Sequence, residues 1–360
     1  MKKTEIKLSN GEIATIVDTD KVKVLKSENY NFLFNKSDGF FARYGKTAED
    51  DGDLNVSLPE IIDMEISTAC HGVGTPCKFC YKSNTSKGEY MNFETFKKVF
   101  AKLPSSITQL AAGIGDIDSN PDIWKIFEYC RENSVIPNVT INGARMTSEY
   151  FDNLATYCGA VAVSVYDKNL TYNAIKELTD RGMKQINIHF MISEQSIYTA
   201  YEVINDMQTD SRLSKMNAIV FLSLKQKGNA KTGFTQLPQD KFNDLCKYAI
   251  SKKIRFGFDS CSSRKYYNYL DSDDSLTKEF KEQMNQCIEP CESSIYSSYV
   301  NVNGDYFPCS FCEGVNDEWK NGLSILECND FLTDIWNNEK TKNFKKKLLS
   351  CNRDCPIYKI

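Results

Sequence analysis

Histidine is scarce in this chain, with only two residues, His71 and His189, among 360. Zinc and non-haem iron sites that need several histidine ligands are therefore nearly excluded. Long apolar runs are also missing, since no segment approaches the roughly 18 uninterrupted apolar residues of a spanning helix. The first residues, MKKTEIKLSNGE, carry positive charge, but no apolar run follows them. We therefore expect a cytoplasmic protein without membrane contact.

Neither sign of charge dominates, because 44 basic and 48 acidic residues give a formal net charge of −4 at pH 7. A chain with this balance does not attract nucleic acid as a whole, and any such contact would need a local patch. Hydrophobic residues make up 41% of the chain, so core material is ample. A length of 360 residues exceeds the usual size of one hydrophobic core. One large domain with additions, or two domains, is expected.

Cysteine, in contrast, is abundant, with fourteen residues. A reducing compartment disfavours structural disulfides, so metal binding or catalysis is the expected reason for so many thiols. With so little histidine, ligation by thiolates alone remains, and it suits zinc or iron–sulfur clusters.

Strand-like and helix-like segments alternate between about residues 60 and 260. The first pair is the strand IIDMEIS (61–67) and the helix NFETFKKVFAKL (92–103), which Asn92 is expected to cap. Further apolar strands are predicted at 107–113, 137–141, 160–166, 185–192, 218–224 and 254–260, with amphipathic helices between them. Strands this uniformly apolar are buried on both faces, which predicts a parallel α/β sheet or barrel.

The two ends of the chain have other patterns. Residues 1–60 contain two strand pairs around Asn-Gly and Asp-Gly turns, which predicts a small antiparallel β addition. Beyond residue 262 the strand–helix alternation stops, and cysteines follow at 287, 291, 309, 312, 328, 351 and 355. We predict three parts: a β-rich addition (1–60), a parallel α/β domain (61–262) and a cysteine-rich metal-binding module (263–360).

One loop after the first parallel strand, STACHGVGTPCKFCYKSNT (67–85), holds Cys70, Cys77 and Cys80. In parallel α/β folds ligands bind at the carboxyl ends of the strands, so these thiols are expected at the binding edge. A four-cysteine zinc site is the simpler interpretation of such a C-x2-C pair, but no second pair lies nearby. Three thiolates leave one coordination position open, which is typical of a catalytic metal centre.

The segment Cys70…Cys77-Lys78-Phe79-Cys80-Tyr81 resembles the cluster loop of radical S-adenosylmethionine (SAM) enzymes, although the first gap holds six residues and the family usually has three. The resemblance implies a partial (β/α)6-type parallel barrel, and a [4Fe–4S] cluster held by Cys70, Cys77 and Cys80 and chelated by SAM. Downstream, GIGD (113–116) resembles the family's glycine-rich segment that binds the SAM amino group, although any strand–helix turn can need glycine. The implied SAM-binding residues are Phe79, Tyr81, Gly113, Gly115, Asp116, Asn142 and Ser164. Asn142 and Ser164 also suit a turn and a helix cap.

The C-terminal cysteines resemble a second motif. Cys291, Gly304 and Cys309 form a C-x12-G-x4-C pattern similar to the opening of SPASM and twitch modules, in which a glycine-turned hairpin carries ligands of an auxiliary iron–sulfur cluster. The resemblance implies one auxiliary [4Fe–4S] cluster, with Cys261, Cys291, Cys309 and Cys355 as the preferred ligands. Cys287, Cys312, Cys328 and Cys351 are candidates for a second cluster or are spare, whereas Cys130, Cys158 and Cys246 lie in helical patterns and are expected in the core.

The implied function is reductive cleavage of SAM and hydrogen abstraction from a peptide or protein, leading to cross-linking, epimerisation or oxidation. An electron donor such as flavodoxin or ferredoxin would be the partner. Modification of a nucleotide or nucleic acid is the alternative, because residues 16–45 faintly resemble a β-rich segment beside phage homing-endonuclease domains, but no phosphate-binding face is evident. A non-catalytic iron–sulfur or zinc protein is the third possibility. No catalytic residue is assigned, and His189 is expected to be a buried structural histidine that is satisfied by a backbone carbonyl.

Overall fold

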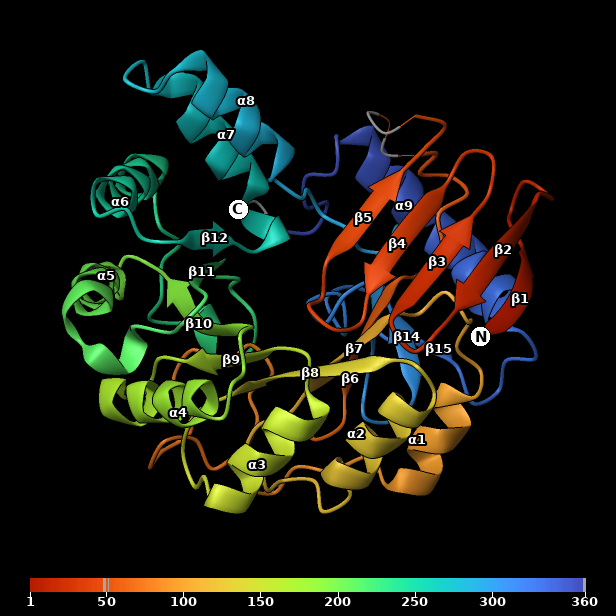
Figure 1. The fold of residues 1–360 in the computed structure, drawn as a ribbon, viewed down its shortest axis with the longest axis horizontal. Coiled ribbons are helices and arrows are strands. Elements are labelled where there is room, and N and C mark those ends of the chain that lie inside the picture. The colour runs from red at the N-terminus through yellow and green to blue at the C-terminus, as the bar shows by residue number, and fades with distance from the viewer. Residues whose placement is uncertain (48–49, 51, 359–360) are drawn as a thin grey trace.

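The computed structural model describes residues 1–47, 50 and 52–358. Its strands form two sheets, one with five strands and one with ten (Figure 1). The smaller sheet is an antiparallel meander of the N-terminal strands β1 (Lys2–Lys7), β2 (Ile13–Asp18), β3 (Val22–Lys26), β4 (Asn31–Asn35) and β5 (Phe41–Tyr44). The predicted Asn10-Gly11 and Asp38-Gly39 turns join β1 to β2 and β4 to β5, and both glycines have positive φ.

A parallel strand–helix array makes up most of the larger sheet, as predicted. Its strands are β6 (Ile61–Glu65), β7 (Gln109–Gly113), β8 (Ile136–Ile141), β9 (Val161–Ser164), β10 (Ile186–Ile192), β11 (Ala218–Ser223) and β12 (Phe256–Phe258). The connecting helices are α1 (Phe93–Phe100), α2 (Ile123–Glu132), α3 (Ser148–Tyr157), α4 (Lys168–Asp180), α5 (Ile197–Thr209) and α6 (Gln239–Ser251). These helices form an arc around the outer face of the curved sheet, which is the partial barrel expected from the sequence (Figure 1).

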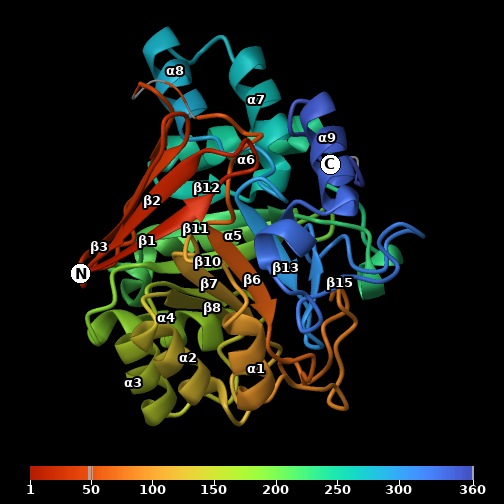
Figure 2. The same cartoon turned by 90° about the vertical axis from the view of Figure 1, so that its right-hand side faces the viewer.

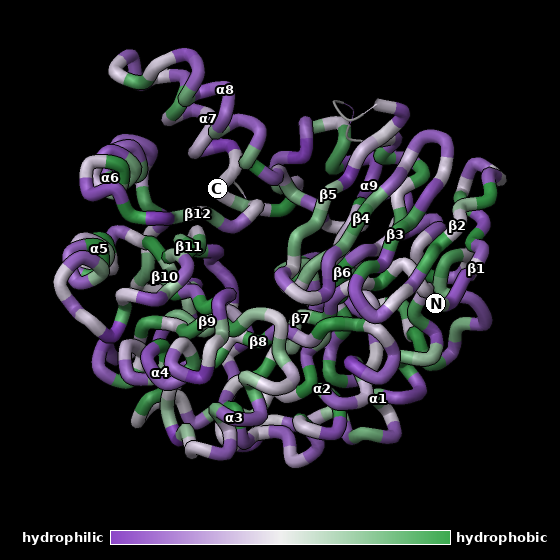
Figure 3. The backbone as a smooth tube through the Cα atoms, in the orientation of Figure 1, coloured by the Kyte–Doolittle hydropathy of each residue, from purple (hydrophilic) through white to green (hydrophobic). Residues whose placement is uncertain are grey.

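Alternation along the strands separates the two faces of this barrel. In β6, Ile62 and Met64 are fully buried against the helices, whereas Ile61 is partly buried and Asp63 is exposed on the inner face. β10 repeats the pattern, with Ile188 and Phe190 buried and His189 and Met191 only partly so. Hydropathy also alternates along the helices (Figure 3). The main core therefore lies between sheet and helices, and solvent reaches the inner face.

The C-terminal part extends the same sheet. It contains α7 (Ser263–Ser272), α8 (Lys278–Gln286), β13 (Ser297–Val300), β14 (Asp305–Phe307), β15 (Leu323–Ser324), a π-helical turn (Leu332–Trp336) and α9 (Glu339–Ser350). β13 pairs in parallel with β6, and β14 and β15 continue the sheet in antiparallel fashion. The predicted hairpin glycine, Gly304, has φ +85° between β13 and β14. The sequence patterns did not predict that this hairpin joins the barrel sheet.

The N-terminal sheet packs against the amino-terminal ends of the barrel strands (Figures 1 and 2). Lys23 Nζ donates to the carbonyl oxygen of Ile107 at 2.5 Å, just before β7. Gln185, just before β10, contacts the carbonyl of Asp38 at 3.4 Å. Tyr30 donates to Glu60, just before β6, at 2.5 Å. This sheet therefore covers the barrel end opposite the cysteine loop. Short 3-10 turns, Ser211–Leu213, Gly228–Lys231 and Ser260–Ser262, complete the regular structure.

Across the described part of the chain, none of the helices combines the length and the apolar character that crossing a membrane requires.

An ion pair fastens the N-terminal sheet to the barrel. Arg43 reaches both oxygens of Glu60 at 2.8 and 2.7 Å, and its guanidinium lies 3.4 Å from the centre of the Tyr296 ring. Glu60 is only 3% exposed, so its charge depends on this partner.

We predict that Arg43→Met lowers the free energy of unfolding by about 3 to 5 kcal/mol, because it leaves a buried carboxylate without its partner. Lys347→Met, which breaks an exposed pair with Glu318, is the matched control and should change stability little. Urea denaturation measures both. The double variant Arg43→Met/Glu60→Gln should recover most of the loss, and equal stability of Arg43→Met and the control would contradict the prediction.

Candidate functional site

The loop that follows β6 presents three thiols at the carboxyl edge of the barrel. Cys70, Cys77 and Cys80 are free and partly exposed. The pKa of Cys70 and of Cys77 is raised to about 11, mainly by burial and in smaller part by the neighbouring thiols. Both groups are therefore protonated at neutral pH in the free protein, and binding a metal there would release protons.

The six residues between Cys70 and Cys77 form a tight turn. Gly72 has φ +67°, and a Cβ at this position would lie 2.0 Å from the carbonyl oxygen of Thr75. The backbone N–H of Gly72 donates to Cys70 Sγ at 3.3 Å. The turn is therefore compatible only with glycine at position 72, and it bends the chain back beside the first thiol.

The glycine-rich segment GIGD packs directly against this loop. A Cβ on Gly115 would lie 2.3 Å from both the Ala69 carbonyl oxygen and Cys70 Cβ, so only glycine permits the approach. A Cβ on Gly113 would meet Glu65 Cα at 3.2 Å. The predicted glycines thus lie beside the first cysteine.

Asp116, the acid of that segment, is 1% exposed and holds the loop. It accepts from the His71 backbone N–H at 2.6 Å, from Asn142 Nδ2 at 2.8 Å and from Arg145 at 2.5 Å. Its Oδ1 lies 3.7 Å from Cys70 Sγ. Burial would raise the pKa of Asp116, but the hydrogen bonds from Arg145, His71 and Asn142 outweigh it and lower the pKa. Asp116 is therefore ionised at neutral pH, with both oxygens engaged.

Aromatic rings flank the second and third thiols. Phe79 stacks on Tyr166 with ring centres 5.6 Å apart, and Phe234 meets it edge-on at 5.7 Å. Tyr166 is 45% exposed at the end of β9, two residues after Ser164, and it interacts with Cys77 and Ser164. The structure therefore brings Phe79 and Ser164 to the same edge, whereas sequence reasoning did not identify Tyr166.

Tyr81, another predicted SAM-binding residue, faces the C-terminal module. Its ring lies 4.4 Å from that of Phe311, and it interacts with the Ser310 side chain. Ser310 and Phe311 lie between Cys309 and Cys312, so the two cysteine loops contact each other here.

The C-terminal thiols gather beside this contact. Cys309 Sγ lies 3.4 Å from Cys312 Sγ, and a hydrogen bond from Cys312 lowers the pKa of Cys309. Cys291 and Cys355 are close enough to interact electrostatically with Cys309, and so is Cys261. The predicted ligands therefore share one region, and Cys312, which the sequence left open between a second cluster and a spare residue, joins them.

The remaining cysteines lie elsewhere or point away. Cys351 directs its thiol to the backbone carbonyls of Lys347, Leu348 and Asp354. Cys287 is exposed, and Cys328 lies near Lys102 and Asp334. The three cysteines expected in the core, Cys130, Cys158 and Cys246, are buried.

A short segment after β11 ties the two cysteine loops together. Asn229 donates its backbone N–H to the Cys80 carbonyl at 2.9 Å and its Nδ2 to the Cys77 carbonyl at 3.1 Å. Lys227 Nζ donates to the Ser310 carbonyl at 2.8 Å. Between them Gly228 has φ +57°, and a Cβ there would lie 2.4 Å from the Tyr81 carbonyl oxygen. We call residues 227–229 the bridging segment.

Charged side chains also connect the loops. Lys82 contacts Glu65 at the end of β6, at 3.2 Å, and pairs with Glu313 just after Cys312. Tyr299 on β13 donates to Glu65 at 2.8 Å and receives a hydrogen bond from Lys82 at 2.7 Å. Burial raises the pKa of Glu65, and Lys82 opposes this. The network is largely buried, so each charge depends on the others.

Asn142, which was predicted to bind SAM, and His189, which was predicted to be structural, both lie on the barrel wall. Asn142 braces Asp116 and accepts from the Ala144 N–H at 2.9 Å. His189 lies on the inner face, where Nδ1 is 3.3 Å from Thr140 Oγ1. Its partner is a hydroxyl group, whereas a backbone carbonyl was expected. Burial lowers the pKa of His189 to about 4, so it is neutral at pH 7.

The donor set fits iron–sulfur clusters better than a single metal ion. Within residues 1–47, 50 and 52–358, no three His, Cys, Asp or Glu side chains converge on one point closely enough to hold one ion. A structural zinc site needs four ligands about 2.3 Å from the metal. Thiols alone, spread over a partly exposed loop, are the donors that iron–sulfur clusters use.

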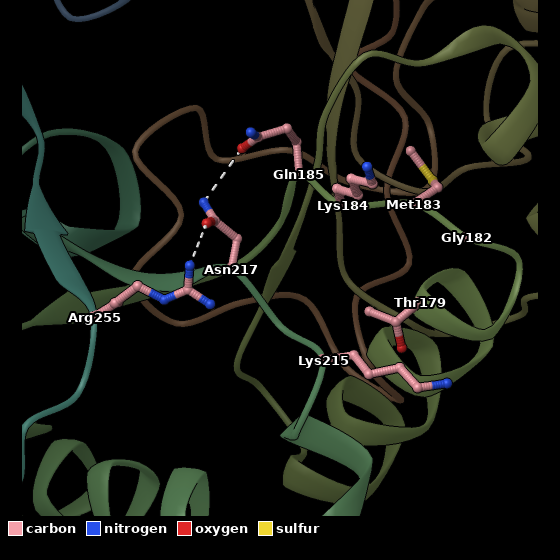
Figure 4. Close-up of a pocket in the computed structure, with 8 residues that line it drawn as sticks. All are labelled: Thr179, Gly182, Met183, Lys184, Gln185, Lys215, Asn217 and Arg255. Carbon is pink, nitrogen blue, oxygen red and sulfur yellow. Dashed lines mark hydrogen bonds between the residues drawn. The ribbon is translucent and has the colours of Figure 1, made fainter. Parts of the chain in front are cut away.

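A separate pocket lies at the opposite end of the barrel, where α4 leads into β10 and where β11 and β12 begin (Figure 4). Arg255 donates to Asn217 Oδ1 at 3.4 Å, and Asn217 donates to Gln185 Oε1 at 3.3 Å. Lys184 and Lys215 add charge at its rim. None of the predicted site residues lines this pocket.

We predict that Gly228→Ala destabilises the bridging segment and moves the Cys80 loop. The left-handed backbone alone costs about 1 kcal/mol, and the contact with the Tyr81 carbonyl adds to it. Gly233→Ala is the matched control, because Gly233 has φ +79° and nothing within 4 Å of its Cβ position. Unfolding free energy and the alkylation rate of Cys80 measure the effect. Equal losses in both variants, with unchanged alkylation, would show that the contact has no role.

We predict that acid destabilises the protein partly through His189. The unfolded state binds a proton near pH 6.5 but the folded His189 only near pH 4, so unfolding takes up protons between these values and stability falls as the pH falls. Between pH 7 and pH 5 this amounts to about 2 kcal/mol. Denaturation of His189→Asn should show a correspondingly smaller loss, and parallel pH curves for both proteins would refute this.

Comparison with known proteins shows which family model and which solved structures this chain resembles. A protein-family model for SPASM, described as an iron–sulfur cluster-binding domain, matches residues 276–356. No curated protein matches the chain. Among solved structures, SuiB of Streptococcus suis bound to the precursor peptide SuiA is similar, with 13% identity and a TM-score of 0.69, over 92% of this chain and 90% of that one.

Two further structures are similar. SuiB bound to S-adenosylmethionine has 14% identity and a TM-score of 0.66, over 91% of this chain and 90% of that one. anSMEcpe with bound AdoMet and the Cp18Cys peptide has 13% identity and a TM-score of 0.55, over 80% and 83%. At such identities the likeness shows the fold, while the family model identifies the C-terminal module. The chain therefore shares the fold of SuiB and anSMEcpe, and its C-terminal residues 276–356 match the SPASM iron–sulfur cluster-binding domain.

Proposed function

We propose that this protein is a radical SAM enzyme that abstracts a hydrogen atom from a peptide or protein substrate. The observation that carries the proposal is the thiol triad Cys70, Cys77 and Cys80 at the carboxyl edge of a partial barrel whose sheet continues into a SPASM domain. SuiB binds the precursor peptide SuiA, and anSMEcpe binds both AdoMet and a peptide, which supports a peptide substrate here.

Three thiols would hold a [4Fe–4S] cluster and leave one iron for SAM. When bound, the cluster and SAM supply one-electron chemistry that yields 5′-deoxyadenosine and removes a hydrogen atom from the substrate. Gly115 lets the backbone approach Cys70, and Asp116 fixes the loop through the His71 N–H. The protein thus positions the thiols before the cofactors bind.

The aromatic pair at the edge of the site suits a flat ring. Phe79 and Tyr166 are stacked, and Tyr166 keeps an exposed face. We assign this pair to the adenine of SAM, with Ser164 nearby as a polar contact. Gly113, Asn142 and Asp116 shape the opposite wall. In this assignment Asp116 acts through the loop, because its oxygens are already engaged.

An auxiliary [4Fe–4S] cluster would occupy the C-terminal thiols. Cys291, Cys309 and Cys355 lie around one region, and both Cys261 and Cys312 are available as the fourth ligand. The contact between Tyr81 and Phe311 places the two cysteine loops side by side. A low-potential donor such as flavodoxin or ferredoxin would supply the electron, and fourteen free thiols suit the reducing cytoplasm.

Anaerobically reconstituted protein, given dithionite and SAM, is expected to release 5′-deoxyadenosine. The triple variant Cys70→Ala/Cys77→Ala/Cys80→Ala should lose this activity and about four irons, while the C-terminal cluster remains. Cys246→Ala, a buried thiol in α6, is the matched control and should keep both. Iron analysis and chromatography measure the outcome.

Two results would contradict the proposal. Folded, iron-loaded protein that forms no 5′-deoxyadenosine with several reductants would exclude the radical SAM reaction. Zinc in place of iron, lost on replacing the same three cysteines, would favour a structural metal protein.

A further inference from the structure

A single carboxylate, Asp63, lies on the inner face of the barrel wall. Its neighbours in β6, Ile62 and Met64, are buried under the helices, so Asp63 points to the opposite face. It sits in register between Tyr299 of β13 and Ala111 of β7. Asp63 is exposed to solvent although it lies in a central strand, which shows that water reaches this part of the inner face.

Other charges along this wall are paired. Glu65 and Glu313 share Lys82, and Tyr299 adds a hydrogen bond to Glu65. Farther round the barrel, Asp259 pairs with Lys225. Among the described residues no hydrogen bond or ion pair engages Asp63. It therefore offers an unpaired carboxylate on a wall where Glu65, Glu313 and Asp259 each contact a lysine.

Asp63 lies between the carboxyl edge of the barrel and the end that the N-terminal sheet covers. It lies two residues before Glu65, hence about 7 Å deeper than the carboxyl edge where the cysteine loop begins. Glu65 contacts Lys82, two residues after Cys80, at 3.2 Å, so Asp63 lies on the wall below the point where this loop contacts β6. The N-terminal sheet covers the other end of the barrel. A ligand of Asp63 would therefore enter past the cysteine loops.

We propose that Asp63 is a specificity-determining residue that binds a protonated amine or guanidinium of the substrate peptide. This inference rests on the proposed function, because it assumes that a peptide occupies the inner face. A carboxylate that sits in a strand of the barrel wall and lacks a protein partner favours a cation over an apolar or acidic side chain. The neighbouring wall displaces part of the hydration of Asp63 and raises its pKa to about 6, which agrees with an unsatisfied charge that a bound cation would stabilise.

A long cationic side chain suits the depth at which Asp63 lies below the carboxyl edge. A side chain held by Asp63 would anchor the peptide below the thiol triad, leaving the residues next to it near the carboxyl edge. Arg and Lys reach several ångströms from their backbone, so the peptide backbone would remain at the level of Glu65 and Lys82. Asp63 would then contact the substrate while a neighbouring residue reacts.

The test uses three acetylated tripeptide amides as probes: Gly-Lys-Gly, Gly-Arg-Gly and the uncharged Gly-norleucine-Gly. Their affinities for anaerobic holoenzyme with SAM are measured by calorimetry or ligand-detected NMR. We expect the wild type to bind the lysine or arginine probe about tenfold more tightly than the norleucine probe. Asp63→Asn should abolish this preference, and Asp63→Glu should retain most of it.

Asp20→Asn, an exposed carboxylate in the turn between β2 and β3, is the matched control and should keep the preference. Circular dichroism melting checks that Asp63→Asn is folded, as expected for a solvent-exposed replacement. Equal affinities of all probes for the wild type, or an unchanged preference in Asp63→Asn, would overturn the inference. Release of 5′-deoxyadenosine is measured on the same samples, so loss of the proposed reaction is distinguishable from loss of cation binding.

Discussion

The parallel pairing of β13 with β6 is the contact on which the arrangement of the two cysteine sites depends. β6 delivers the loop with Cys70, Cys77 and Cys80, and β13 leads through its hairpin to Cys309 and Cys312. The hairpin turn after β13 lies level with the end of β6, and the antiparallel β14 then runs back, so Cys309 follows at the level of the start of β6. Residues 310–313 after it meet the first loop through the contacts of Phe311 with Tyr81 and of Glu313 with Lys82. A SPASM module attached by a flexible linker would leave the relative position of the loops undefined.

A network of buried charged side chains then holds together the two cysteine loops that the strand pairing brings close. Lys82 lies in the first loop, Tyr299 on β13, and Glu313 follows Cys312, so the network spans both modules. Removing Lys82 would leave the carboxylates of Glu65 and Glu313 without their shared cation in a poorly hydrated place. The bridging segment donates hydrogen bonds to backbone carbonyls of both loops, from the Lys227 side chain and from the backbone and side chain of Asn229. Separate types of interaction therefore hold the same junction, which makes it rigid.

Much of this fold was predictable, because the period of the apolar residues sets the strands and helices one by one. The apolar patterns IIDMEIS and INIHFMI predict β6 and β10. Asn92 caps α1 as expected, because its side chain accepts a hydrogen bond from the Thr95 N–H. What local patterns cannot encode is contact between distant segments. The pairing of β13 with β6, the coupling of Cys312 to Cys309, and the turning of Tyr81 towards Phe311 all depend on residues more than 200 positions apart or on thiol geometry. The exposed ring of Tyr166 was missed because a strand-end aromatic carries no motif.

The long gap between Cys70 and Cys77 finds a physical explanation in Asp116. An extended loop has more conformations to lose on ordering, so its thiols would be poorly positioned without an added restraint. Asp116 supplies that restraint by accepting from the His71 N–H, directly after Cys70, while Arg145 and Asn142 hold its own carboxylate. Gly72 then closes the turn without a side chain that would strike Thr75. The carboxylate of Asp116 is thus committed to ordering the loop, so in this chain the extra residues and the occupied carboxylate belong together.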